Sequence, residues 1–266
     1  NKEIKTVKVE KVQLQDLPIS IKGEGRVGSL KSIKVTSEVQ GQILNGVNLK
    51  KGQSFKSGEL LYQLNSKEYS LGLKARKSSF ITMLAGMLAD IKQDFPEQYS
   101  TWRTFYSSVS PEDALPTIPM PESSKEKTFI ATKGISAEYY NIKSMEEKLR
   151  KYAYYAPFSG SVLASYTDKG AIVNPGSPII DIIQNGNLEV EIPLSTEASK
   201  IIRVGSLVTL TDKNTNKKYA GKVQRKGSFV NATTQSIPVY VQINTGEDLY
   251  SGMYLTAEFA AGDRKS

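Results

Sequence analysis

Apolar and polar residues alternate with a period of two over much of the first 64 positions. The alternation is clear in Thr6–Val12 and again in Ile19–Lys22, and short intervals between glycines interrupt the apolar residues from Ser32 to Leu64. A period of two indicates a strand with one buried face, and closely spaced glycines leave room only for short strands and tight turns. The pattern predicts β structure over this part of the chain.

The period becomes helical at Asn65. Asn65 followed by Glu68 is typical of a helix N-cap with its N3 acceptor, and glycine becomes rare after it. Apolar residues then recur at helical spacing through Lys92, namely Leu71, Leu73, Phe80, Ile81, Leu84, Leu88 and Ile91. This spacing predicts one helix of about 26 residues, which is on the order of 40 Å long.

Prolines interrupt the helical pattern between Asp94 and Pro121. Five occur there, at positions 96, 111, 116, 119 and 121, and a continuous helix cannot pass through them. The run Ser110–Asp113 resembles a helix cap with proline at its first position and predicts one helical turn. Ser123 with Glu126 predicts the start of a second helical stretch through Lys151, bent at Gly134. We therefore expect a helical hairpin with a proline-rich tip.

Strand-like patterns return at Ala153 and continue to the end of the chain. Residues 188–194 and 239–243 alternate as half-buried strands do, and Asp212–Lys218 is a polar turn. Gly23-Glu24-Gly25 lacks the Lys-Ser helix start of a phosphate loop. It is interpreted as the end of a strand.

An internal repeat flanks the predicted hairpin. Glu38–Ile43 is similar to Pro157–Val162, and each copy continues with two glycines six positions apart. Phe55 lies midway between the glycines of the first copy, and Val173 lies midway in the second. Half-motifs of about 30 residues bury only one face each, so two of them pack face to face as a small sandwich. The hairpin is then an insertion between the halves of one β domain.

The two half-motifs resemble the halves of a biotinyl or lipoyl carrier domain. Split by a hairpin and followed by more β structure, the chain resembles the membrane fusion protein family, the periplasmic adaptor subunits of bacterial efflux pumps (HlyD-like, AcrA type). Gly52–Tyr62 is similar to the family pattern G-x-x-V-x-x-G-x-x-L, and Tyr155–Val162 to A-P-F-x-G-x-V. Leu249–Tyr254 is similar to L-x-P-G-M, with Ser251 in place of the proline.

The resemblance implies a mainly β, elongated, multi-domain chain with an inserted α-helical hairpin. A lipoyl/biotinyl-like β-sandwich carries the hairpin and is joined to a β-barrel. The expected domains are 1–30 (N-terminal strands of the barrel and of a partial membrane-proximal domain), 31–65 (first lipoyl-like half), 66–151 (hairpin), 152–184 (second half), 185–260 (barrel) and 261–266 (tail, the start of a truncated membrane-proximal domain). Structural glycines are expected at Gly41, Gly52, Gly58, Gly160, Gly170, Gly176 and Gly252.

Aromatic residues cluster just before the proline-rich segment, and their spacing of three to four places them on one side of a helix. They either pack the far end of the hairpin or contact a partner, since Trp and Tyr often anchor interfaces. The candidate partner-contact residues are Trp102, Phe105, Tyr106, Val109, Leu115, Ile118 and Met120. The Arg, Leu and Ser tip motif of well-known family members is absent here, so the tip partner stays open.

Composition narrows the possible chemistry. The chain of 266 residues has no cysteine and no histidine, which excludes disulfides, thiolate or imidazole metal sites and Cys or His catalysis. Glu189 and Glu191 share one strand face but have no metal-ligand partners in the pattern, so a solvated face is favoured. We expect no catalytic residue, no cofactor and no metal. The formal net charge of +8 is compatible with solubility alone, or with binding to nucleic acid, anionic lipid or an acidic protein surface.

The resemblance implies an adaptor that links an inner-membrane RND-type transporter to an outer-membrane channel protein for the export of small molecules. We expect the protein to self-associate into a ring, to lie in the periplasm of a Gram-negative cell envelope and to be anchored by a segment outside this chain. We do not expect nucleic acid binding, because Arg103 is the only basic residue beside the aromatic cluster. Alternatives are an adaptor of an ABC-type exporter or type I secretion system, a biotin or lipoyl carrier, and a stand-alone surface-binding β protein. The carrier alternative is weakened because Asp168-Lys169 lies inside the second half-motif.

Overall fold

The computed structural model describes residues 20–45, 50–243 and 249–260. The chain divides into two compact units, one made of Asn1–Lys31 with Gln184–Ser266 and the other of Ser32–Ile183. The expectations for residues 1–19 and for the 261–266 tail lie outside the described residues. Each unit has its own hydrophobic core.

The first unit is a closed six-stranded barrel with the strand order β1-β10-β13-β12-β11-β14. Every pair of neighbouring strands is antiparallel. A six-residue helix, α5 (Thr196–Ile201), follows β10. The strands are β1 (Ser20–Ser29), β10 (Leu188–Ser195), β11 (Leu207–Thr211), β12 (Lys218–Lys226), β13 (Ser236–Ile243) and β14 (Tyr254–Ala260).

The alternation predicted for residues 188–194 fills the interior of the barrel. Every second residue of β10 from Leu188 to Leu194 is buried and the residues between them are more exposed. The interpretation of Gly23–Gly25 as a strand end is wrong, because both glycines lie inside β1. A Cβ at Gly25 would come within 2.6 Å of the side chains of Val190 and Ile192, so the absent side chain leaves space for this core.

The β part of the second unit is a sandwich of two four-stranded sheets, β2-β9-β7-β4 and β6-β5-β3-β8. The first half contributes β2 (Ser32–Thr36), β3 (Gly41–Asn45), β4 (Ser54–Phe55) and β5 (Leu60–Leu64). The second contributes β6 (Ala153–Tyr155), β7 (Gly160–Ser165), β8 (Ile172–Val173) and β9 (Pro178–Gln184). Each sheet contains two strands from each half, and one shared core lies between the sheets.

The two halves of the repeat hold each other through equivalent hydrogen bonds. The amide of Gly52 donates to the carbonyl of Val162, and the amide of Gly170 donates to Ile43, each over about the same distance, 2.8 Å. The second glycine of each copy behaves alike, since Gly58 donates to Ala156 and Gly176 to Ser37, again at 2.8 Å. All four glycines have positive φ, as does Gly252. The sequence repeat is thus an approximate twofold relation in space.

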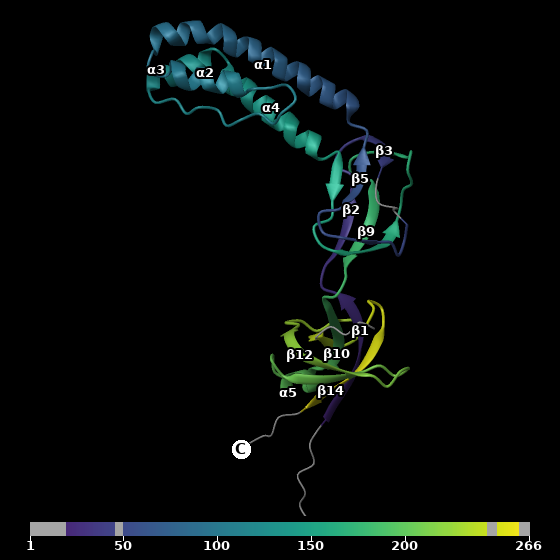
Figure 1. Cartoon of the computed structure of the whole chain (residues 1–266). Helices are drawn as coiled ribbons and strands as arrows, with labels where there is room; N and C mark the ends of the chain where they lie inside the picture. The colour runs from purple at the N-terminus through teal and green to yellow at the C-terminus, as the bar shows by residue number, and fades with distance from the viewer. Residues whose placement is uncertain (1–19, 46–49, 244–248, 261–266) are drawn as a thin grey trace, which may run out of the picture. The chain divides into compact units, whose positions relative to one another are not determined.

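Four helices form the insertion: α1 (Lys67–Asp94), α2 (Tyr99–Ser108), α3 (Ser124–Thr132) and α4 (Ile135–Arg150). Helix α1 contacts α4 and α2, and Figure 1 shows α1 and α4 running beside each other. Ser123 accepts from the amide of Glu126 as predicted, at 3.1 Å. Gly134, with φ of 73°, separates α3 from α4.

Two further local predictions were wrong. The N-cap of α1 is Ser66, and Asn65 instead accepts a hydrogen bond from the amide of Lys67. No helical turn forms at Ser110–Asp113, and the additional helix is α2, which precedes this segment. The predicted fold class, mainly β with an inserted helical hairpin, a lipoyl-like sandwich and a barrel, is confirmed.

Candidate functional site

Helix α1 is the longest element of the hairpin and supplies one continuous buried stripe. Its 28 residues bury Leu73, Lys77, Phe80, Leu84, Met87 and Ile91, which follow each other at spacings of three and four. This spacing places them on one face of the helix. The other helices pack on that face and form a single core.

The aromatic residues of α2 belong to this core. Trp102 and Phe105 are 1% and 4% exposed, and the ring of Phe105 meets Phe80 of α1 edge-on at 6.4 Å. The indole Nε1 of Trp102 donates to the carboxylate of Glu126 at 2.8 Å. Glu126, itself 1% exposed, also accepts from the amide of Glu122 at 2.8 Å. Helix α2 is therefore locked to the start of α3.

The proline-rich segment after α2 does not form the tip. Residues 109–122 run back along the hairpin, where Figure 1 shows them as an extended loop beside α4. Glu112 pairs with Lys74, in the third turn of α1, and the amide of Leu115 donates to Glu146 of α4 at 2.8 Å. The expected proline-rich tip is therefore wrong for residues 109–115, which fold back beside Lys77 and Glu146, whereas the last residues of the segment lead into the Ser123 cap of α3.

A buried ion cluster holds this returning segment in place. The ammonium of Lys77, a residue 3% exposed, lies 2.6 Å from the carboxylate of Glu146 and donates to the carbonyl of Asp113 at 2.6 Å. Lys143 donates to the carbonyl of Leu115 and lies 3.3 Å from Glu146. Lysine and glutamate are rarely buried unless paired, and here each has several partners.

The charged form of Glu146 is favoured inside this cluster. Burial by itself raises the pKa of a carboxyl group. The hydrogen bonds and charge of Lys77, the amide of Leu115 and Lys143 outweigh it, so the pKa of Glu146 lies below its ordinary value. Lys77 and Glu146 therefore remain an ion pair at neutral pH. The cluster holds the loop in position, and its charged groups are paired and buried.

The candidate contact residues separate into two groups. Trp102, Phe105, Val109 and Leu115 are buried in the hairpin core, between 1% and 7% exposed, and offer no surface to a partner. Tyr106 and Ile118 are half-buried against the same core. Met120 is 87% exposed and precedes the Ser123 cap of α3. Of the seven, Met120 alone presents most of its side chain to solvent.

The far end of the hairpin, away from Lys67 and Arg150, consists of the turn after α1 and of helix α3 (Figure 1). The rings of Phe95 and Phe129 meet there at 5.4 Å. Lys125 lies over the ring of Phe95 at 5.2 Å, and Lys133 pairs with Asp90 of α1 at 2.6 Å. The sequence indicated aromatic residues near this end, but not which segment forms it.

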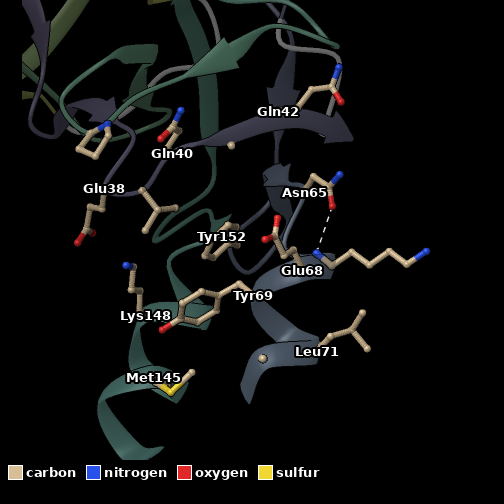
Figure 2. A pocket seen from close by; sticks show the side chains of 15 residues that line it. Glu38, Gln40, Gln42, Asn65, Glu68, Tyr69, Leu71, Met145, Lys148 and Tyr152 are labelled. Atoms are coloured by element: carbon tan, nitrogen blue, oxygen red, sulfur yellow. Dashed lines mark hydrogen bonds between the residues drawn. The ribbon is translucent and has the colours of Figure 1, made fainter. Parts of the chain in front are cut away.

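A cleft of about 1170 Å³ lies where the hairpin joins the sandwich (Figure 2). Tyr69 of α1 stacks on Tyr152 at 5.5 Å, and Lys148 lies over the ring of Tyr69 at 5.4 Å. Beside the cleft, Lys151 pairs with Glu38 at 2.6 Å. No sequence pattern indicated this site. Its walls come from both halves of the repeat and both ends of the hairpin, which are far apart in the sequence.

Two properties of the described residues bear on chemistry and location. In the ranges 20–45, 50–243 and 249–260, no group of three or more acidic residues is placed to hold a metal ion. No helix in the same ranges is both long and apolar enough to span a membrane.

The interlocked halves and the inserted hairpin agree with a known family. Residues 31–184, more than half of the chain, match the family model described as RND MFP, barrel-sandwich hybrid domain. The chain belongs to the membrane fusion protein family. The matched range contains both halves of the sandwich and the whole hairpin between them.

Two curated relatives match most of this membrane fusion protein. It is 25% identical over 240 residues to a multidrug resistance protein MdtA of Xenorhabdus bovienii, matching 87% of this chain and 55% of that protein. A second MdtA, of Photorhabdus laumondii, is 23% identical over 91% of this chain and 60% of the relative. The chain thus spans little more than half the length of these curated relatives.

A solved structure shows the same fold. A MacA–MexA chimeric protein, which contains the Pseudomonas aeruginosa MexA α-hairpin domain, superposes with a TM-score of 0.65 at 18% identity. The alignment covers 93% of this chain and 82% of the chimera. The likeness extends over barrel, sandwich and hairpin.

Proposed function

We propose that this membrane fusion protein is a periplasmic adaptor that links an inner-membrane RND-type transporter to an outer-membrane channel protein, for the export of small molecules. The observation that carries the proposal is the family match over 31–184, which includes a hairpin inserted between two interlocked β halves. The multidrug resistance function in the name of the two relatives supports export as the process.

The proposed role is mechanical. Helix α1 alone, with 28 residues, extends about 40 Å, which gives the hairpin reach beyond the sandwich. Copies associate side by side as a ring, so that many weak contacts act together. The adaptor acts without catalysis, cofactor or resident metal. The buried ion cluster around Lys77 and Glu146 serves to hold the hairpin in one shape.

The far end of the hairpin is the proposed contact with the outer-membrane channel. Met120 is the candidate anchor, because it is 87% exposed and lies three residues before the Ser123 cap, where the returning segment reaches α3 at this end. Tyr106 and Ile118, which are half-buried against the hairpin core, are secondary candidates. Trp102, Phe105, Val109 and Leu115 act indirectly, by fixing α2 and the returning segment.

Complementation of compound sensitivity tests the function. The gene is deleted in its own host, and the wild-type protein, supplied from a plasmid with its native flanking segments, is expected to restore resistance to exported compounds. Met120→Asp is expected to restore it less well. Met83→Asp, on the side of α1 and 37% exposed, is the control and is expected to behave as wild type. The proposal fails if the deletion changes no export phenotype.

The transporter class is tested by crosslinking the barrel to proteins of the inner membrane. Capture of an RND transporter supports the proposal. Capture of an ABC-type exporter would keep the adaptor role and replace the transporter. The intact mass of the natively expressed protein tests the carrier alternative, since a biotin or lipoyl adduct on Lys169 would show a different function.

A further inference from the structure

One end of the barrel gathers two loops and both ends of its described chain. Strand β1 starts at Ser20 opposite Ala260, the last residue of β14, and β10 ends at Ser195 opposite Ser236, the first residue of β13. The connection from β10 to β11 therefore lies at this end, together with the loop from β12 to β13. The opposite end of the barrel is the one at which Ser29 of β1 pairs with Leu188 of β10.

Five large apolar side chains are exposed in these two connections and at Leu207, the first residue of β11. Leu207 is 71% exposed, Val204 63%, Phe229 60%, Ile201 50% and Val230 45%. We call these five residues the end patch. The barrel core does not account for them, because neighbouring residues such as Ile202 and Val208 already fill it. Several large apolar side chains exposed at one end of a domain indicate an interaction surface.

The backbone that carries the end patch is fixed. Lys226 at the end of β12 donates to the carbonyls of Ser199 and Ile202, the latter at 2.8 Å, and so ties the end of α5 to the barrel. In the other loop, Asn231 accepts from the amides of Thr233 and Thr234 at 2.9 and 3.2 Å. The apolar side chains are therefore held outward by a structured support.

The charges around the end patch are mostly positive. Lys200 and Arg203, both exposed, flank Ile201 and Val204 in the sequence, and Lys222 is the strand partner of Leu207. Residues 196–207 and 227–235 contain a single acidic residue, Glu197. An apolar tip with cations beside it suits the boundary of an anionic bilayer, where aliphatic groups enter the acyl region and ammonium and guanidinium groups stay at the phosphates.

We propose that this barrel end binds the surface of a membrane that contains anionic phospholipid. Phe229 and Leu207 enter the interface, while Lys200, Arg203 and Lys222 pair with phosphate groups. Charge complementarity and the outward placement of the apolar side chains favour a lipid surface over a protein groove. The inference is independent of the transporter and channel partners proposed above.

Vesicle flotation with the full chain tests the inference. Wild-type protein is expected to float with vesicles of phosphatidylethanolamine and phosphatidylglycerol, less at high salt, and weakly with pure phosphatidylcholine. Replacing Leu207 and Phe229 together by serine is expected to lower the partition coefficient about tenfold or more. Replacing Lys200 and Arg203 by glutamine is expected to weaken binding and its salt dependence.

The control is Ile172→Ser, since Ile172 is also 71% exposed but lies on β8 of the sandwich. It is expected to float as wild type does, and circular dichroism checks that every variant is folded. The inference is overturned if wild-type protein does not float, or if the Leu207 and Phe229 variant floats as well as Ile172→Ser, which would assign lipid binding to another part of the chain. It is also overturned if the end patch binds only membranes that retain their proteins.

Discussion

At the scale of single residues, Lys77 shows how a buried charge shapes the hairpin. It lies on the apolar stripe of α1, between Leu73 and Phe80, and is 3% exposed. The sequence pattern did not single out Lys77, and a helical period gives no reason for a lysine among buried apolar residues. The reason comes from Glu146 and from the carbonyl of Asp113, which are distant in sequence. A helical period involves only neighbouring positions of the sequence, so it cannot show that two distant residues form an ion pair.

Glu146→Gln is expected to destabilise the hairpin by about 3 kcal/mol at pH 7, because it leaves the Lys77 ammonium buried without a counter-ion. Since the pKa of Glu146 is lowered in the folded state, its contribution is complete above its ordinary pKa of 4.5 and is lost as the pH falls through the lowered value. The difference between variant and wild type should therefore shrink in acid. Urea unfolding followed by the fluorescence of Trp102, the single tryptophan, measures it.

Glu147→Gln is the matched control for this experiment. Glu147 pairs with Arg150 at 3.0 Å, but its side chain is 61% exposed, and exposed ion pairs contribute little. The unfolding midpoint should stay close to that of wild type at every pH. Equal effects of the two substitutions would contradict the role of the buried cluster.

Gly160 gives a second prediction at this scale. A Cβ there would lie 2.0 Å from the carbonyl oxygen of Ile183, so Gly160→Ala must displace backbone of β9. We expect a loss of about 1–3 kcal/mol, measured by thermal unfolding. Gly86→Ala, where no atom lies within 4 Å of the new Cβ, should be neutral or slightly stabilising. A stable Gly160→Ala protein would show that the two chain segments do not approach as described.

At the scale of elements, periodicity and proline positions predicted α1, the returning α4 and the strands well, because each depends on local sequence. Pro96 and Pro111 also bracket α2, which the aromatic spacing indicated but the proline count obscured. The path of residues 109–122 was not predictable in the same way. It depends on Lys77, Glu146 and Lys143 meeting in space. Four of the seven candidate contact residues, Val109, Leu115, Ile118 and Met120, were therefore placed on a segment whose path the sequence did not indicate.

Pairing between the halves is testable because the natural chain has no cysteine. The hydroxyl oxygens of Ser54 on β4 and Ser161 on β7 lie 3.3 Å apart, so cysteines at both positions are expected to form a disulfide under mild oxidation. Gel mobility without reductant detects it. Ser54→Cys with Ser165→Cys, at the other end of β7, should stay reduced. Crosslinking of the control pair alone would contradict the strand register.

At the scale of the whole molecule, the internal repeat was the most informative feature of the sequence. It predicted that a hairpin interrupts one β domain, and the equivalent hydrogen bonds of Gly52 and Gly170 show the physical basis of that repeat. The barrel end patch had no such signal. Its apolar residues lie in two separate parts of the sequence, 201–207 and 229–230, and only the pairing of the barrel strands brings these parts to one end.

The most direct measurement of the adaptor function is photocrosslinking in living cells from two positions. A photoreactive residue replaces Met120 on the hairpin in one strain and Tyr254 on the barrel, 68% exposed, in another. The account predicts an outer-membrane channel protein in the adduct from position 120 and an inner-membrane transporter in the adduct from position 254. Adducts with the same partner from both positions, or none from a folded and functional protein, would contradict it.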